Sequence, residues 1–173
     1  MDIKLEKRAN EVVYTFDKIP SSDEDIVNLD EYLKEPSFAP AFFLITMCGY
    51  EKNKEFCFKV LEELNGPKDV SNYDRSYYED RFMDGKFYKP YSYFEGATPQ
   101  NNYTPSVPYV VHVYDNPNGP TDEGYKGFLL QSSGSDSKRQ VTVRLKPSVG
   151  NWYLTQEMLL ADIKVPVKDD DWA

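Results

Sequence analysis

The sequence predicts an α+β fold, in which N-terminal helices pack on a C-terminal antiparallel sheet of three to four strands in a two-layer arrangement. Three observations lead to this prediction. Apolar residues recur at helical spacing in residues 1–87, which we expect to be mainly helical. Residues 88–173 hold short β-rich runs separated by proline and glycine. No internal repeat divides the 173 residues, so we expect a single domain over residues 1–173.

The earliest elements are a short segment and two helices. Residues 12–16 fit a short strand or an extended arm. Ile26, Leu29 and Leu33 recur at helical spacing after an acidic start, where the helix dipole favours negative charge. Residues 39–49 are apolar around nearly the whole helix circumference, so this helix is expected at the centre of the core.

Two further helices are expected before Gly85. Residues 51–64 carry an apolar stripe and are followed by Asn65, Gly66 and Pro67, a strong helix stop. Residues 71–85 begin with a sequence that resembles a capping box.

The second half of the chain begins with a proline-rich and aromatic segment, residues 85–108. Irregular segments of this length are uncommon within a compact domain. We therefore expect this one to pack as an extended strap across the boundary between the helices and the sheet. Alternating and β-branched residues then predict four strands, at residues 109–114, 125–131, 141–145 and 152–154.

Apolar residues on the inner faces of these elements are expected to form the core. They are Ile26, Leu29, Phe43, Leu44, Met47, Val60, Leu61, Leu64, Val111, Val113, Leu129, Val141, Val143 and Trp152. Trp152 is expected to be buried beside Leu145 or Val143 across a hairpin turn. Trp172 follows three aspartates and is expected in a solvated tail.

Charge and composition narrow the function classes. The net charge of −9 argues against nucleic acid and anionic membranes as partners. The N-terminus does not resemble a secretory signal, and no apolar run is long enough to span a membrane. Cys48 and Cys57 are interpreted as buried thiols of a cytoplasmic protein, with a disulfide as the alternative. No cofactor or metal motif is present, and the oligomeric state stays open.

A few polar residues are candidates for catalysis. His112 is the only histidine, and on a strand it is usually a structural residue, although it is also the most suitable general base. Asp80 and Asp84 lie one helical turn apart and form a possible carboxylate pair, although interleaved basic residues favour a solvated face. Together with Arg144, these three residues are the candidates for an alternative function, an enzyme with carboxylate or anion-binding chemistry.

Tyrosine and phenylalanine are concentrated between Tyr73 and Tyr114, where they make up 12 of 42 residues. Such residues form either a core between helices and sheet or a binding surface for a protein or a sugar. If this tyrosine cluster is a binding surface, its candidate residues are Tyr77, Tyr78, Tyr88, Tyr91, Tyr93 and Tyr103.

Several strings in the second half resemble a known family. They are Ser92 to Pro99, Asn102 to Pro105, Pro108-Tyr109, Glu123 to Tyr125, and the closing segment from Trp152. Together they resemble small bacterial proteins, mostly of Gram-positive anaerobes, that are classified only as a domain of unknown function. The resemblance covers about Phe16 to Ala173. It implies a bacterial, cytoplasmic protein, and it supplies no activity, substrate or catalytic residues.

The sequence favours a non-catalytic interaction module of the bacterial cytoplasm over an enzyme. Its acidic helices, with 19 acidic and 12 basic residues in positions 1–87, suit a protein partner with a basic surface. The two alternatives are the enzyme described above and carbohydrate binding by tyrosine stacking.

Overall fold

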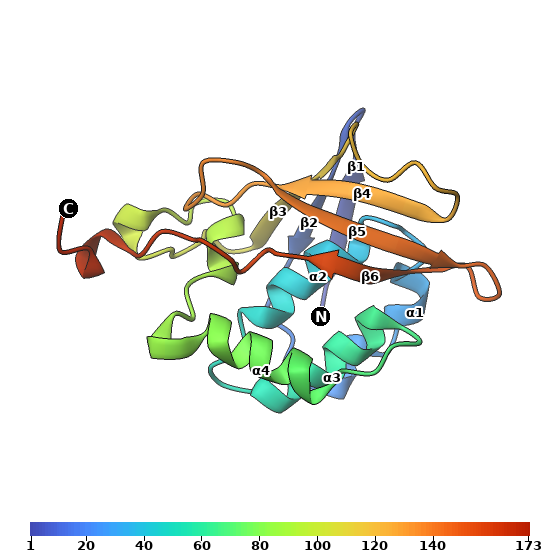
Figure 1. Ribbon diagram of the computed structural model, residues 1–173, viewed down its shortest axis with the longest axis horizontal. Coiled ribbons are helices and arrows are strands. Elements are labelled where there is room, and N and C mark those ends of the chain that lie inside the picture. The colour runs from blue at the N-terminus through green and yellow to red at the C-terminus, as the bar shows by residue number, and fades with distance from the viewer.

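The computed structural model describes all 173 residues and contains helices and one antiparallel sheet, which confirms the α+β class. The six strands lie in sequence order from one edge of the sheet to the other (Figure 1). The strands are β1 (Ile3–Lys7), β2 (Glu11–Phe16), β3 (Tyr109–Asp115), β4 (Tyr125–Leu130), β5 (Arg139–Lys146) and β6 (Asn151–Glu157). The α-helices are α1 (Leu29–Tyr32), α2 (Phe38–Met47), α3 (Lys54–Asn65) and α4 (Asn72–Arg81). Single 3-10 turns form at Asp23–Ile26, Met83–Gly85, Pro90–Tyr93, Pro99–Asn101 and Val167–Asp169.

The prediction of three to four strands is wrong, because an N-terminal hairpin adds β1 and β2 to the sheet. In β2, Tyr14 and Phe16 are fully buried and lie opposite Val111 and Tyr109 of β3. β1 is an edge strand with mostly exposed side chains, and its charged sequence lacks the apolar pattern of a central strand. The first half of the chain is therefore not purely helical.

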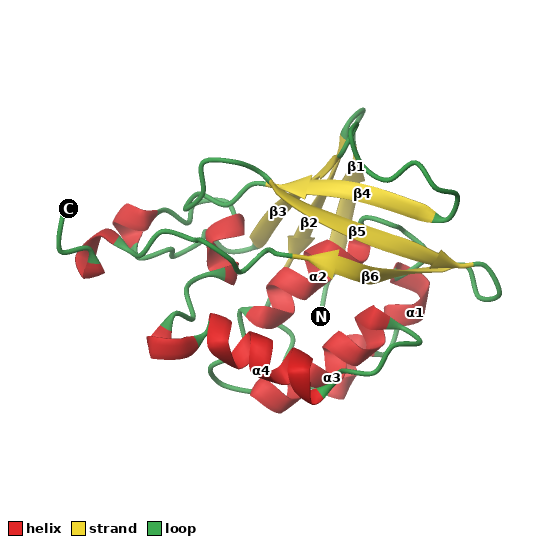
Figure 2. Ribbon diagram, viewed as in Figure 1, coloured by secondary structure: helices red, strands yellow, loops and turns green.

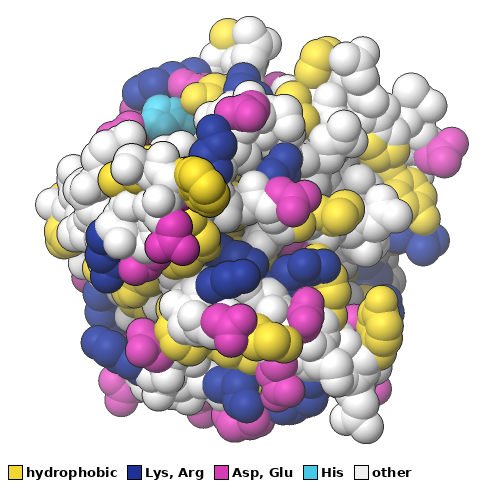
Figure 3. All heavy atoms as spheres, turned by 60° about the vertical axis from the view of Figure 1, so that its left-hand side comes forward, with side chains coloured by type: hydrophobic (Ala, Val, Ile, Leu, Met, Phe, Trp, Pro, Cys, Tyr) yellow, Lys and Arg dark blue, Asp and Glu magenta, His cyan; other side chains and the backbone are white.

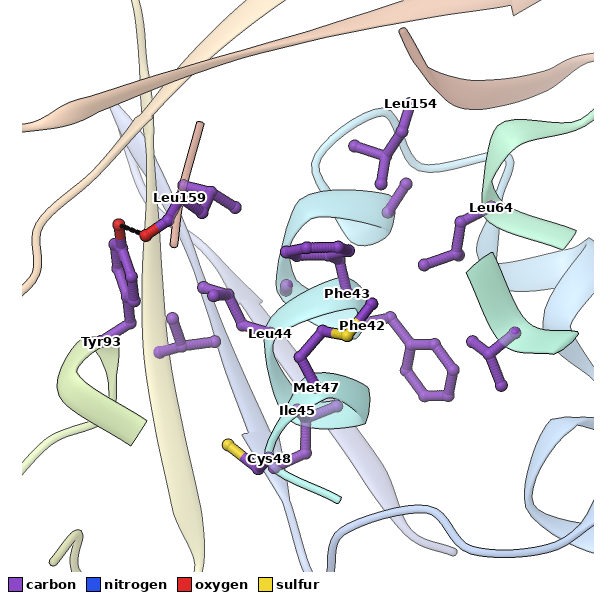
Figure 4. Packing of buried hydrophobic residues seen from close by; sticks show 14 of the residues in the cluster. Phe42, Phe43, Leu44, Ile45, Met47, Cys48, Leu64, Tyr93, Leu154 and Leu159 are labelled. Atoms are coloured by element: carbon purple, nitrogen blue, oxygen red, sulfur yellow. Dashed lines mark hydrogen bonds between the residues drawn. The ribbon is translucent and has the colours of Figure 1, made fainter. Parts of the chain in front are cut away.

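Helix α2 forms the centre of the core, as its sequence predicts. All ten of its residues are buried. It contacts β3, β6 and α3, and this contact on several sides explains why it has no polar face. Figure 4 shows Phe42, Phe43, Leu44 and Met47 pointing from α2 into the surrounding cluster.

Local caps define the next two helices. The Asn53 side chain accepts the N–H of Phe56 at the start of α3, and α3 ends at Gly66. At the start of α4, Ser71 and Asp74 form the predicted capping box.

One hydrophobic cluster of 36 buried residues joins the helices to the sheet. Leu129 is only half-buried, because its neighbours Phe128 and Leu130 are the residues of β4 that face the core. The predicted inner face of β4 is therefore displaced by one residue. Ile26 is likewise half-buried.

Trp152 occupies the predicted position opposite Leu145, but it is half-buried and not fully buried as expected. It lies near the end of the edge strand, where it packs against the margin of the hydrophobic cluster. Its main-chain N–H donates to the carbonyl of Leu33 at 2.8 Å, which links β6 to the α1 region. Trp172 is 96% exposed, in agreement with the expected solvated tail.

The helices α2, α3 and α4 lie on one side of the sheet in Figure 2, and the other side is not covered by a helix. Strand side chains alternate between these two sides. In β5, Val141 and Val143 are buried towards the helices. Gln140, Thr142 and Arg144 therefore point to the opposite side, which we call the outer face of the sheet.

Candidate functional site

Three tyrosines of the predicted binding cluster are buried. Tyr78, Tyr93 and Tyr103 are at most 7% exposed. Their hydroxyl groups donate hydrogen bonds of 2.5 to 2.7 Å to the Glu157 carboxylate and to two main-chain carbonyl groups near the C-terminus. Figure 4 shows one of these bonds, from Tyr93 to Leu159. We therefore assign these three tyrosines to the core and not to a binding surface.

The other three tyrosines of the cluster are half-buried. Tyr88 stacks on Tyr103 with 5.2 Å between the ring centres, and Tyr77 lies 4.8 Å beneath the Arg81 guanidinium group. Tyr91 donates a hydrogen bond of 2.9 Å to a main-chain carbonyl at the end of α2. Each of these side chains already has an internal partner, which favours the core interpretation of the tyrosine cluster.

The four residues of the enzyme alternative do not form one site. Asp80 is exposed on α4, and Asp84 is exposed in the turn after it. His112 of β3 and Arg144 of β5 lie on the outer face of the sheet, away from the helices. The possible carboxylate pair is therefore separated by the sheet from the histidine and the arginine.

His112 lies between two carboxylates. Its Nδ1 atom is 2.9 Å from a carboxylate oxygen of Glu11, and its Nε2 atom is 2.6 Å from one of Glu95. Glu11 comes from the neighbouring strand β2 and Glu95 from the segment that precedes β3. Figure 3 shows the single histidine, in cyan, at the surface beside basic and acidic side chains.

Further charges surround this histidine cluster. Arg8 pairs with Glu11 at 3.0 Å and with Glu6 at 3.3 Å. The ring of Tyr114 stacks beside the imidazole, and the Lys138 ammonium group lies 4.2 Å above the centre of that ring. Sequence reasoning missed both carboxylates of the cluster, since Glu11 is 101 residues from His112. The pairing of β2 with β3 brings Glu11 to His112, and the main-chain N–H of Glu95 donates to the carbonyl of Val110, which holds Glu95 beside β3.

The two carboxylates favour the charged form of His112. Burial opposes that charge, but the hydrogen bonds and negative charges of Glu95 and Glu11 outweigh it and raise the pKa of His112. A neutral imidazole has one N–H and can donate to only one carboxylate. The observed geometry therefore favours an imidazolium, which links three segments by ionic hydrogen bonds.

This link predicts a pH-dependent stability. A raised folded-state pKa means that the contribution is fully present below the unfolded value of about 6.5 and is lost as the pH rises through the folded value. We expect the melting temperature of the wild type to fall as the pH rises through this range. The fall per pH unit should be smaller in His112→Gln, because the glutamine side chain does not titrate. Thermal unfolding followed by circular dichroism at a series of pH values measures this, and equal slopes for the two proteins would refute the link.

A groove runs from the outer side of β5 across the edge strand β6 to α3 and α4. Two overlapping depressions form it, the larger with a volume of about 1220 Å³. One end is bounded by α4 and the other by the loop between β3 and β4. The residues that line both depressions are Asn65, Lys68, Gln140, Thr142, Leu154, Thr155 and Gln156. Most of them carry amides, hydroxyls or a positive charge, so the groove is polar.

The wider part of the groove carries three unpaired cations. Lys68, Arg144 and Lys146 line it, and none of them forms an ion pair within 4.0 Å. The acidic residue in the same lining is Asp122. In a protein with a net charge of −9, this part of the surface is locally positive.

Two tyrosine rings of the groove have internal contacts, whereas Tyr73, at the α4 end, is 79% exposed. The Arg144 guanidinium group lies 5.1 Å from the ring centre of Tyr125. The ring of Tyr153 lies directly against Gly66, where an added Cβ atom would be 2.5 Å from a ring carbon. No histidine or cysteine lines the groove, and its carboxylates, Asp74, Glu157, Asp162 and Asp122, come from four different segments.

Comparison with protein families identifies a match for most of the chain. The model of a domain of unknown function (DUF6935) matches residues 16–167. The chain belongs to this family. The family description states no activity, and neither the curated proteins nor the solved structures contain a match. The matched range includes the groove and His112, whereas Glu11 precedes it.

Two further observations concern membranes and metal ions. None of its helices combines the length and the apolar character needed to cross a membrane. No three histidine, cysteine, aspartate or glutamate side chains converge in an arrangement suited to a metal ion.

Proposed function

We propose that the protein is a non-catalytic interaction module, which binds a partner protein through the groove across β5 and β6. The observation that carries the proposal is the set of unpaired cations, Lys68, Arg144 and Lys146, in a polar groove on the outer face of the sheet. Unpaired charges in a hollow surface suit recognition of a complementary charge.

The alternatives are less well supported. A histidine base would need a ring nitrogen free to take a proton, whereas both ring nitrogens of His112 contact carboxylates that raise its pKa. Carbohydrate binding by stacking would need several open aromatic faces, whereas Tyr125 and Tyr153 are contacted by Arg144 and Gly66, which leaves Tyr73 as the exposed ring of the groove.

A partner with a basic surface, as the sequence suggests, would meet the acidic side chains of the helices. Several of these acids already have partners. Lys59 pairs with Asp23 at 2.6 Å, and Arg75 pairs with Glu55 at 3.1 Å. The groove is therefore the stronger candidate for the interaction surface.

The proposed function includes a location in the bacterial cytoplasm. Cys48 and Cys57 are buried and not joined in a disulfide, which suits a reducing compartment such as the bacterial cytoplasm. Burial raises the pKa of both thiols, so they are expected to be inert and to serve in packing.

Site-specific photo-crosslinking in cells that carry the protein tests the proposed function. We expect a photoreactive residue at Gln156, in the groove, to give a discrete protein adduct. The same residue at Glu62, exposed on α3, should give none. Absence of an adduct from the groove, equal adducts from both positions, or turnover by the purified protein in a broad hydrolase screen would each reject the proposal.

A further inference from the structure

We infer that the groove across β5 and β6 takes an extended acidic peptide segment of its partner and that Arg144 is the main carboxylate-binding residue. The inference rests on the proposed function and adds the chemistry of the occupant. It replaces the expectation of a basic partner by an acidic one at this surface. Three features of the described residues support it: the geometry of Arg144, the charge of the strands, and the direction of the main chain in β6.

Arg144 is held in a position that suits a carboxylate. It is exposed on the outer face of β5 and lies opposite Tyr125 in the ladder between β4 and β5. The tyrosine ring supports the guanidinium group, which forms no ion pair within 4.0 Å. A guanidinium group that stacks on an aromatic ring keeps the N–H groups at its edge free, and these can bind a carboxylate through two parallel hydrogen bonds.

The charge of the surrounding strands is opposite to that of the protein. Residues 124–156 contain five basic residues and a single acidic one, although the whole chain has a net charge of −9. The single acidic residue, Asp136, is paired with Lys164 at 3.0 Å. The basic residues are Lys126, Lys138, Arg139, Arg144 and Lys146. Lys126 lies outside the groove lining, and the end of the groove at α4 is also lined by Asp74, Glu157 and Asp162. The net positive charge is therefore confined to the wider part of the groove, where it attracts an acidic ligand and repels a basic one.

The main chain of β6 favours a peptide as the ligand. β6 is an edge strand, and the N–H of Trp152 points away from β5 to the carbonyl of Leu33. Trp152 and Leu154 lie opposite Leu145 and Val143, so the N–H of Leu154 points in the same direction. Leu154 lines the groove, together with Thr155 and Gln156. An extended chain can pair with such an edge, and its acidic side chains can then reach the cations.

Fluorescence anisotropy with a labelled octa-aspartate peptide tests the inference on the full chain. We expect salt-sensitive binding to the wild type and an affinity loss of about tenfold in Arg144→Gln, as for a lost charge-assisted hydrogen bond. Tyr125→Phe should keep the affinity, because it retains the ring that supports Arg144, whereas Tyr125→Leu should lower it. Lys52→Gln is the matched control, because Lys52 is an exposed lysine remote from the groove lining. Circular dichroism verifies that each variant is folded.

Several outcomes would overturn the inference. One is equal affinity of the wild type and Arg144→Gln, and another is an equal loss in Lys52→Gln, which would indicate a non-specific charge effect. Tighter binding of an octa-lysine peptide, or of a sulfated oligosaccharide with the same dependence on Arg144, would also reject it. A groove-specific photo-adduct that octa-aspartate fails to compete away would reject the acidic occupant while leaving the proposed function intact.

Discussion

Phe42→Ala is expected to destabilise the protein by about 3–5 kcal/mol, a large part of the roughly 5–15 kcal/mol that holds a typical domain folded. Phe42 is fully buried in α2. Its ring lies 5.1 Å from that of Phe38 and 6.2 Å from that of Phe16 in β2. The truncation would therefore leave a cavity where the central helix meets the N-terminal hairpin.

Chemical denaturation followed by circular dichroism measures this effect. Val27→Ala is the control, since Val27 is 74% exposed and its change should stay within about 0.5 kcal/mol. If Phe42→Ala also changed the free energy of unfolding by no more than that amount relative to the wild type, the result would contradict the position of α2 at the centre of the core.

Gly66→Ala is expected to lower the free energy of unfolding by about 3 kcal/mol, at the upper end of the range for strained backbone positions. Gly66 ends α3 with φ +65° and ψ −119°, a conformation that L-residues avoid. A Cβ atom there would also collide with the ring of Tyr153, as close as 2.5 Å. Because Tyr153 lines the groove, the same change should weaken peptide binding.

Gly150→Ala separates these two causes. Gly150 also has a positive φ, of +78°, but nothing lies within 4 Å of an added Cβ atom. Its substitution should cost only about 1 kcal/mol from backbone conformation. Thermal melts of both variants compare the two costs, and equal destabilisation would show that the contact between Gly66 and Tyr153 is not tight.

Local patterns in the sequence predict most of the fold. The helical spacing, caps and stops of α2, α3 and α4 and the alternation in β3 to β6 all lie within single segments, and the structure contains these elements. The hairpin of β1 and β2 was missed as part of the sheet, because the strand partner of Tyr14 is Val111, far along the chain. Leu129 was misplaced because its neighbours are equally apolar, so alternation gives no preference for one face.

The candidate site was predictable only in part. Arg144 and His112 stand out by residue type, but the partners that decide their roles come from other segments. Glu11 and Glu95 contact both ring nitrogens of His112 and raise its pKa, which favours a link between segments over a free base. The tyrosine cluster was ambiguous because an aromatic side chain is equally suitable for a core and for a surface. Burial decides between the two, and burial depends on tertiary packing.

Amide NMR spectra of the isotopically labelled full chain, titrated with the octa-aspartate peptide, test the central claim most directly. The account predicts that shift changes concentrate at Lys68, Arg144 and Leu154, around the groove. They should be absent from the exposed acidic residues Glu55, Glu62 and Glu63 of α3, which do not line the groove. The opposite pattern, in which octa-aspartate leaves the groove unchanged and an octa-lysine peptide shifts the amides of α3 and α4, would contradict the account and restore the expectation of a basic partner.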